Sequence, residues 1–116
     1  MPDMTKYRPM LERIIARYGK QDQMAKCHEE CHELANALEG YPRVETEGDV
    51  IFEIADVLIM ATQMAYIFGE SEVKLAIDYK LERQAKRMGI EYTPVHGESL
   101  LAHPEDGDHP WRKEGV

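Results

Sequence analysis

The segment from Val50 to Phe68 constrains most strongly what this chain can fold into, because apolar residues lie on all sides of it. They are Val50, Ile51, Ile54, Val57, Leu58, Ile59, Met60, Met64 and Ile67. A helix that is apolar all round must be buried, either in a protein core or in a membrane. This segment also contains Glu53, Asp56 and Gln63, and acidic residues are rare inside membranes. We therefore expect a central helix of a soluble protein over residues 49–68, with no membrane association.

Three further helices are indicated by apolar residues that recur at helical spacing. The first is predicted over residues 9–18, after a loose start, and Gly19 is placed to end it. The second is predicted over residues 23–39, with Asp22 as its N-cap. The last is predicted over residues 71–88, capped by its first residue, a serine.

Together these helices predict an all-α fold of four-helix-bundle type over residues 1–89. From residue 90 onward the sequence changes, because prolines, glycines and histidines become frequent and no period persists. Residues 90–116 are therefore predicted to be an irregular tail that is disordered or docked on the body or on a partner chain. Trp111 is the expected docking anchor. The tail histidines without ligand spacing are His96, His103 and His109.

Two acidic pairs require a chemical explanation. Glu30 and Glu33 are three residues apart in the second helix, and Glu53 and Asp56 are three apart in the apolar one, a spacing at which both side chains point the same way. Burying an ionised carboxylate is costly, and a divalent cation with oxygen ligands relieves that cost. Converging from facing helices, the two pairs predict a Mg²⁺ site, with Mn²⁺ as an alternative ion. The simpler interpretation is that Glu30 and Glu33 form a solvated helix flank.

The sequence CHEECH at 27–32 suggests a different metal site, but helical phase argues against it. The apolar stripe of the second helix consists of Met24, Cys27, Cys31, Leu34 and Leu38. Both cysteines then behave as small core residues, while Glu30 lies at one edge of the stripe and His28 and His32 at the other. Zinc is a weak alternative. The two cysteine Cβ atoms would be roughly 5–6 Å apart, too far for a relaxed disulfide, which favours a reducing, cytoplasmic setting.

The charge distribution narrows the classes of partner. A net charge of −8 argues against nucleic acid and anionic membranes, because both require a basic surface. A phosphate ligand is still compatible with this charge, since a metal ion can bridge two acidic groups. On the last helix, Lys80, Arg83 and Arg87 share one face. They are either solvated beside Asp78 and Glu82 or form a cationic rim for phosphates.

These motifs resemble those of a known family. EECHEL at 29–34 resembles the EExxEL motif of the MazG-like, all-α nucleoside triphosphate pyrophosphatases, and EIAD at 53–56 resembles their following ExxD motif. YGKQDQMAK at 18–26 is similar to the family's lead-in, and the basic helix with Lys80 and Arg83 stands where its last core helix would. The resemblance covers about residues 8–88. The basic helix reads KLERQ and lacks the asparagine often found near that point.

The resemblance implies Mg²⁺-dependent hydrolysis of a nucleoside triphosphate to the monophosphate and pyrophosphate, by a homodimer or homotetramer. The implied metal ligands are Glu30, Glu33, Glu53 and Asp56. The implied substrate-binding residues are Lys26, Lys80 and Arg83. For catalysis, Glu29 or Glu33 would orient the water that attacks the α-phosphorus.

Two other functions stay open. One is a non-catalytic helical module that binds a nucleotide or a metal without turnover. The other is a dinuclear iron or manganese oxidoreductase, because Glu29 and His32 match one Glu-x-x-His unit of such bundles. The second unit that those sites require is absent from the sequence.

Overall fold

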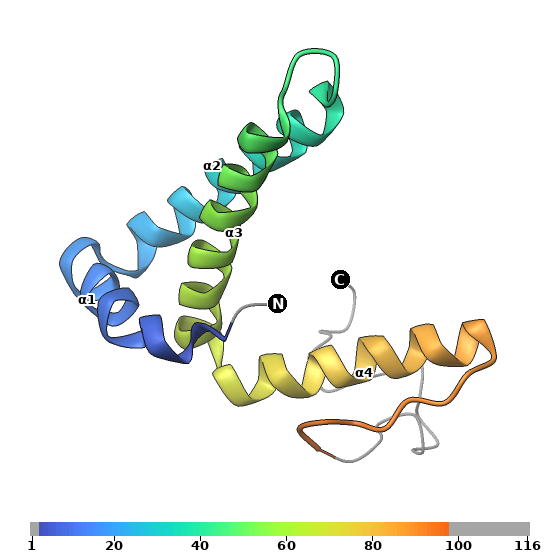
Figure 1. The fold of residues 1–116 in the computed structure, drawn as a ribbon. Coiled ribbons are helices and arrows are strands. Elements are labelled where there is room, and N and C mark those ends of the chain that lie inside the picture. The colour runs from blue at the N-terminus through green and yellow to red at the C-terminus, as the bar shows by residue number, and fades with distance from the viewer. Residues whose placement is uncertain (1–2, 98–116) are drawn as a thin grey trace, which may run out of the picture. The chain divides into compact units, whose positions relative to one another are not determined.

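The structure is a computed structural model that describes residues 3–97. Within that range the chain forms four α-helices and one short 3₁₀ helix, and no strand (Figure 1). The predicted all-α fold is therefore confirmed. The chain divides into two compact units, Met1–Phe68 and Gly69–Val116, and each is described by itself. The four-helix-bundle type stays a prediction, and the predicted domain boundary between residues 89 and 90 falls inside the second unit.

The first unit begins with a 3₁₀ helix, η1 (Met4–Tyr7), which continues directly into α1 (Arg8–Tyr18). Asp3 caps η1 by accepting a hydrogen bond from the backbone N–H of Thr5 at 3.0 Å. The prediction of a loose start is wrong for these residues, because the cap satisfies a backbone donor that would otherwise be free.

α2 (Lys20–Gly40) and α3 (Glu47–Phe68) form an antiparallel hairpin that makes up most of the first unit (Figure 1). Gly19 adopts a φ of 89°, so it reverses the chain within one residue. It is itself the N-cap of α2, and α2 therefore begins three residues before its predicted start. The prediction that Asp22 is the cap is wrong. Asp22 lies in the first turn of α2, where its charge favours the helix dipole.

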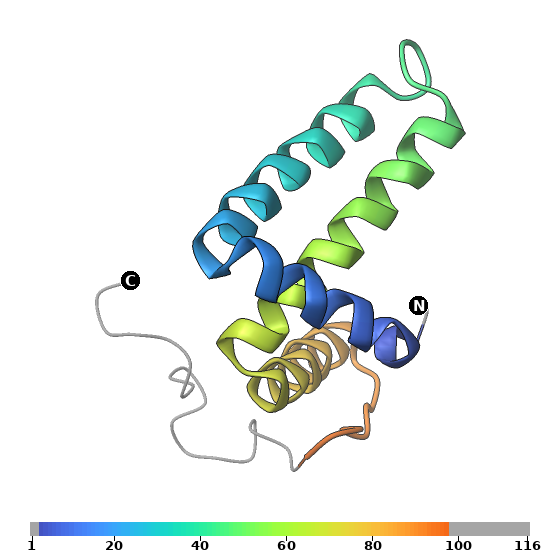
Figure 2. The same ribbon diagram turned by 90° about the vertical axis from the view of Figure 1, so that its left-hand side faces the viewer.

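α1 crosses the end of the hairpin where α2 begins and α3 ends (Figure 2). The guanidinium of Arg8 lies 4.4 Å from the centre of the Tyr66 ring, and the ammonium of Lys20 lies 5.5 Å from the centre of the Phe68 ring. Leu11 supplies the buried apolar side chain of α1. The Arg8 contact ties α1 to the last turns of α3, and the Lys20 contact ties the start of α2 to the same turns.

The start of α3 is fixed by a capping box that the sequence analysis missed. The Thr46 hydroxyl accepts a hydrogen bond from the Asp49 backbone N–H at 3.2 Å, and the Asp49 carboxylate accepts one from the Thr46 backbone N–H at 2.8 Å. The two residues satisfy each other's backbone donors, and hydrogen bonds from Thr46 lower the pKa of Asp49. α3 therefore begins at Glu47 rather than Asp49, and the connecting loop is correspondingly shorter.

The face of α2 that packs on α3 differs from the predicted apolar stripe. The residues of α2 that are buried or half-buried are Gln23, Met24, Cys27, Glu30, Leu34, Ala37 and Gly40. The predicted stripe is therefore right for Met24, Cys27 and Leu34 and wrong for Cys31 and Leu38, which are exposed. Gln23 is buried because it hydrogen-bonds Gln63 of α3 across the seam, whereas Glu30 is buried opposite the acidic side chains of Glu53 and Asp56. Glu30 consequently lies in the middle of the buried face.

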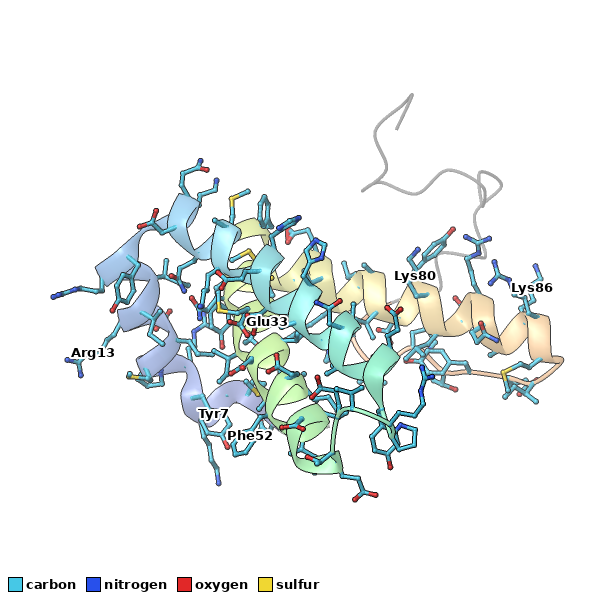
Figure 3. All side chains as sticks on the ribbon, turned by 90° about the horizontal axis from the view of Figure 1, so that it is seen from above. Tyr7, Arg13, Glu33, Phe52, Lys80 and Lys86 are labelled. Carbon is cyan, nitrogen blue, oxygen red and sulfur yellow. The ribbon has the colours of Figure 1, made fainter. Side chains whose placement is uncertain are left out.

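α3 is less enclosed than its apolar sequence predicts. Met60 and Gln63 are its buried residues, whereas Ile51 and Phe52 are exposed, the latter with 73% of its surface accessible (Figure 3). Among the described helices, α3 alone is long and apolar enough to cross a membrane by length and composition, a test that core helices also pass. The expectation that α3 is buried on all sides is therefore wrong, because the described residues of this chain leave part of α3 exposed. The predicted cytoplasmic location and the absence of a membrane partner stay predictions.

The second unit consists of α4 (Glu70–Met88) and the segment that follows it. Gly69 is the N-cap of α4 and no side chain caps this helix, so the prediction that Ser71 is the cap is wrong. α4 ends at Gly89, whose φ of 73° is the left-handed conformation that glycine adopts readily. Of the predicted tail, residues 90–97 are described. Trp111 and the histidines at 103 and 109 lie outside the described residues.

Residues 92–96 are held against α4 by one buried carboxylate. Asp78 is 4% exposed and accepts hydrogen bonds from the Tyr92 hydroxyl at 2.6 Å, from the Val95 backbone N–H at 2.8 Å and from the His96 backbone N–H. Burial alone would raise the pKa of Asp78, but these three hydrogen bonds outweigh it and lower the pKa. Asp78 is therefore an internal anchor and not the solvated partner of Lys80 that the sequence suggested.

Candidate metal centre

Glu30 is the central residue of an acidic cluster between α2 and α3. It is 6% exposed, although it carries a carboxylate on a helix with water on its other sides. Its Oε1 lies 3.3 Å from Nζ of Lys26, one turn earlier on α2. Its Oε2 is buried and has no hydrogen-bond partner within the described part of the chain. A buried carboxylate oxygen without a donor is unfavourable and requires an explanation.

α3 brings two more carboxylates to the same place. One carboxylate oxygen from each of Glu30, Glu53 and Asp56 lies within 4.8 Å of the other two. Glu53 and Asp56 are half-buried, and Oε2 of Glu53 is, like that of Glu30, buried without a hydrogen-bond partner in the described residues. Three acidic side chains from two helices thus converge on a volume small enough for one ion.

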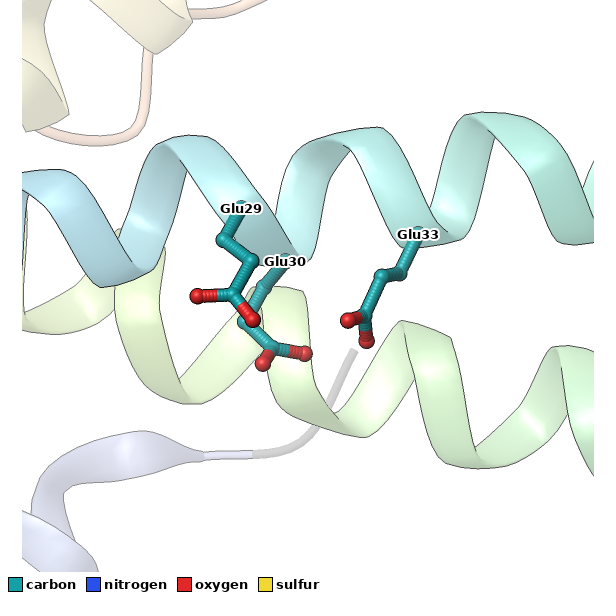
Figure 4. A group of neighbouring side chains, drawn as sticks. All are labelled: Glu29, Glu30 and Glu33. Carbon is teal, nitrogen blue, oxygen red and sulfur yellow. The ribbon is translucent and has the colours of Figure 1, made fainter.

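A second group on α2 overlaps the first. Carboxylate oxygens of Glu29, Glu30 and Glu33 lie within 4.8 Å of one another, and Figure 4 shows Glu30 and Glu33 directed toward α3. Glu30 belongs to both groups, and the carboxyl of Glu33 faces that of Glu53 across the seam. The four residues predicted as metal ligands are therefore brought together. Glu29, predicted as a catalytic residue, stands at the exposed edge of the cluster.

The electrostatics of the cluster follow from its crowding. Burial raises the pKa of Glu53, and the neighbouring charges of Glu33, Asp56 and Glu30 raise it further. Burial also raises the pKa of Asp56, together with the facing carboxyl of Glu30, while Lys26 acts in the opposite direction. Like charges within a few ångströms disfavour the ionised form. The cluster therefore holds more negative charge than its own surroundings neutralise.

Lys26 is the one cation in contact with these carboxylates in the described structure. Its ammonium lies 3.3 Å from Oε1 of Glu30 and 3.8 Å from Oε1 of Glu29. The hydrogen bond to Glu30 and the charge of Glu29 raise the pKa of Lys26. Because half of its side chain is exposed, Lys26 can leave the cluster at small cost. It was predicted as a substrate-binding residue, and it is placed next to the predicted metal ligands.

The donor set fits a hard divalent cation. Mg²⁺ and Mn²⁺ take carboxylate oxygens and keep open positions for water and phosphate, and the orphaned oxygens of Glu30 and Glu53 are such donors. A bound cation would reverse the repulsion that raises the pKa of Glu53 and Asp56. The residues present therefore fit Mg²⁺ or Mn²⁺. The ion itself stays a prediction.

The cysteines and histidines of CHEECH take no part in the cluster. His28 and His32 are exposed, with ring centres 4.8 Å apart in an edge-on arrangement. Cys27 is half-buried and Cys31 is exposed, and burial and the adjoining Cys31 thiol raise the pKa of Cys27. None of these four residues belongs to a group of three or more metal-binding side chains among residues 3–97.

The two remaining predicted substrate residues lie on α4, in the second unit. Lys80 is exposed (Figure 3), and the guanidinium of Arg83 lies 5.7 Å from the centre of the Tyr79 ring. Both residues belong to the second unit, whereas the acidic cluster belongs to the first. Their role toward a substrate stays a prediction.

The sequence analysis did not identify two neutral residues that lie along the same seam as the cluster. Gln23 and Gln63 form a buried hydrogen bond of 2.7 Å between α2 and α3. The available signal was Gln63 itself, a large polar residue in the middle of an apolar run. Its meaning becomes clear only when Gln23 is placed opposite it.

No model of a known protein family matches this chain, and no curated protein or solved structure matches it. The MazG-like resemblance therefore rests on the motifs at 29–34 and 53–56, and membership of that family stays a prediction. What can be argued about function comes from the geometry between α2 and α3.

Proposed function

We propose that the protein is a Mg²⁺-dependent nucleoside triphosphate pyrophosphohydrolase. The observation that carries this proposal is the convergence of Glu30, Glu53 and Asp56, with two buried carboxylate oxygens left without hydrogen-bond donors. Acidic side chains arranged in this way bind a cation that in turn binds phosphate. The MazG-like spacing of the two acidic pairs supports the choice of a nucleotide as the phosphate ligand.

In the proposed reaction, water attacks the α-phosphorus of a nucleoside triphosphate. The bond between that phosphorus and the oxygen bridging to the β-phosphorus breaks, which gives the monophosphate and pyrophosphate. Glu30, Glu53 and Asp56 would hold the cation, with Glu33 as the fourth ligand. The bound cation supplies charge neutralisation and Lewis acidity toward the phosphates.

The remaining polar residues of the cluster have distinct roles in this proposal. Glu29 is exposed at the edge of the cluster, so it can accept the proton that the attacking water releases; Glu33 can take this role if it is not engaged as a ligand. Lys26 balances Glu29 and Glu30 in the metal-free protein. Once a cation neutralises Glu30, the Lys26 ammonium becomes available to a phosphate oxygen.

The test is a substrate panel. The full chain is incubated with each dNTP and NTP in the presence of Mg²⁺, and pyrophosphate is measured. We expect pyrophosphate release from at least one nucleotide. In Glu53→Gln the rate of release should fall by at least about 100-fold, because loss of a metal ligand weakens metal binding at least as much as loss of a residue that supports a ligand. Glu39→Gln removes the same single negative charge at an exposed residue near the end of α2, and this control variant should retain activity. Absence of release with every nucleotide, or full activity in Glu53→Gln, would refute the proposal.

The alternatives give different results in the same experiment. A non-catalytic module would show a thermal shift with nucleotide and Mg²⁺ but no product. A dinuclear oxidoreductase would carry iron or manganese when purified without chelator. Glu29 and His32, the residues that suggested this class, are both exposed, and His32 belongs to none of the described metal-binding groups.

Self-association is part of the proposal. Leu38, Ile51 and Phe52 are exposed on the hairpin, and extensive apolar exposure is typical of surfaces that bind a partner. A homodimer or homotetramer would cover them. Sedimentation analysis should give a mass at least twice that of the chain, and a monomer at micromolar concentration would contradict this part.

A further inference from the structure

A buried amide pair lies along the same helix seam as the carboxylates. Gln63 is fully buried and Gln23 is 6% exposed. The side-chain N–H of Gln23 donates to Oε1 of Gln63 at 2.7 Å, and the side-chain N–H of Gln63 contacts the Met60 sulfur at 3.7 Å. Two uncharged polar side chains are thus buried between α2 and α3.

The amide pair and the acidic pairs share one register of the hairpin. Seven residues along α2 from Gln23 is Glu30, and seven residues back along α3 from Gln63 is Asp56. The carboxyls of Glu30 and Asp56 face each other across the seam. Three residues further in each direction, Glu33 faces Glu53. The hydrogen bond between the glutamines therefore has the same alignment that brings all four carboxylates together.

The carboxylates cannot hold this alignment by themselves. Facing carboxylates repel each other until a cation is bound. If α3 moved by one turn, about 5.4 Å, so that Gln63 lay opposite Cys27, then Glu30 would face Met60 and the repulsion would fall. The same movement would separate Gln23 from Gln63 and leave two buried amides unpaired, which is strongly unfavourable.

We infer that Gln23 and Gln63 are positioning residues, whose mutual hydrogen bond fixes the register of α2 and α3 and holds the carboxylates opposite one another before the cation binds. Buried polar residues in helix seams specify register in this way at some cost in stability. The inference rests on the proposed function in one respect, because it requires a divalent cation at Glu30, Glu53 and Asp56.

The test separates metal affinity from stability. In the double variant Gln23→Leu, Gln63→Leu the buried amide pair is replaced by apolar side chains of similar volume, and the carboxylates are unchanged. We expect its metal-free unfolding temperature to equal or exceed that of the wild type, while its Kd for Mn²⁺, measured by electron paramagnetic resonance, rises by about tenfold or more. Leu11→Met, a change of similar volume at a buried residue of α1 outside the seam, should leave the Mn²⁺ affinity unchanged. Wild-type Mn²⁺ affinity in the double variant would overturn the inference.

Two single variants at position 63 keep the test decisive if the double variant does not fold. Gln63→Asn is one methylene too short to reach Gln23, and its Mn²⁺ affinity should fall. Gln63→Glu keeps both the length and the acceptor oxygen for the Gln23 amide, so its Mn²⁺ affinity should stay near that of the wild type. Equal affinities in these two variants would overturn the inference, as would a wild-type protein that does not bind Mn²⁺.

The failures of the two proposals are distinguishable. A wild type that binds Mn²⁺ but releases no pyrophosphate from any nucleotide would refute the proposed function and leave the positioning role intact. An active wild type whose double variant binds Mn²⁺ normally would refute the positioning role alone.

Discussion

Among residues 3–97, carboxylates are buried in two places with opposite surroundings. Asp78 in the second unit accepts three hydrogen bonds from residues 92–96, and its pKa is lowered. In the first unit, Glu30 and Glu53 each bury an oxygen with no donor among the described residues, and the pKa of Glu53 is raised. The difference is in what faces the acid: hydrogen-bond donors face Asp78, and other carboxyls face Glu30 and Glu53.

The difference separates a structural carboxylate from one that is available to a ligand. Asp78 has all the donors it needs from its own chain, so a cation there would have to displace them. In the α2–α3 cluster, Lys26 pairs with Glu30, and the other groups that face these carboxylates are themselves carboxylates. We interpret this unfavourable arrangement as a sign of function, because strained or unsatisfied groups are common at functional sites. The predictions below test this contrast, beginning with the largest expected effect.

Glu53→Gln should have opposite effects on metal binding and on metal-free stability. Removing this charge relieves repulsion from Glu33, Asp56 and Glu30, so the metal-free variant should unfold at a higher temperature than the wild type. The stabilisation of the wild type by millimolar Mg²⁺ should disappear in the variant. Differential scanning calorimetry with and without Mg²⁺ measures both. A variant that is less stable without Mg²⁺ and still stabilised by it would contradict the contrast.

Asp78→Asn should loosen residues 92–96 without affecting the cluster. The amide keeps one acceptor oxygen in place of two, and the charge that strengthens all three hydrogen bonds is lost. Hydrogen exchange at the Val95 and His96 amides should accelerate by a factor on the order of ten. Unchanged exchange at these amides would show that Asp78 is not the anchor.

The two regions should respond oppositely to acid. For Glu53 and Asp56 the folded pKa lies above the ordinary values of 4.5 and 3.8, so protonation favours the folded state. Their stabilising contribution is complete below those values and is lost as the pH rises through the raised pKa. For Asp78 the folded pKa lies below 3.8, so its contribution is complete above 3.8 and is lost as the pH falls through the lowered pKa.

Exchange protection factors of the metal-free protein measure this difference. As the pH falls through the raised pKa values of Glu53 and Asp56 toward 4.5 and 3.8, protection of α2 and α3 should rise while that of residues 92–96 stays constant. Below the ordinary aspartate value, protection of residues 92–96 should fall. The same pH dependence in both regions would contradict the assignment of their pKa directions.

Lys26→Met should give the smallest effect. Lys26 competes with a metal ion for Glu30, so its removal should tighten Mn²⁺ binding by about two- to threefold at low salt, as expected for a half-exposed ion pair. The gain should disappear at high ionic strength because salt screens exposed charges. Weaker Mn²⁺ binding in this variant would show that Lys26 supports the site.

The sequence predicted the helices well and their ends less well. Periodic apolar residues predicted α1, α2 and α4, because burial of one face dominates helix formation in proteins, and a long run of apolar residues on all sides predicted α3. The starts of α2 and α3 were missed because they depend on backbone features, the φ of Gly19 and the reciprocal hydrogen bonds of Thr46 and Asp49. Such features appear only once the chain path is known.

The acidic residues show a similar division. Helical spacing predicted that Glu30 and Glu33 would act together with Glu53 and Asp56, and the structure places these four side chains in adjoining groups. Hydropathy placed Glu30 at the edge of its helix face, whereas it is buried at the centre. The burial of a polar residue depends on its partners across the seam, and one helix alone does not contain that information.

Asp78 was assigned to the surface for the same reason. Its hydrogen-bond donors come from residues 92–96, a stretch whose composition predicts no regular structure. One buried hydrogen-bond acceptor can order a segment that has no periodic sequence pattern. The spacing of apolar residues does not reveal such an acceptor.

The central claim is that the acids between α2 and α3 bind a divalent cation and that Asp78 does not. It is tested most directly by titrating the full chain with Mn²⁺ while recording paramagnetic broadening of assigned side-chain resonances. We expect saturable broadening that begins at Glu30, Glu53 and Asp56, does not affect Asp78, and disappears in Glu53→Gln. Absence of binding, or weak broadening spread over exposed acids and unchanged in Glu53→Gln, would contradict it.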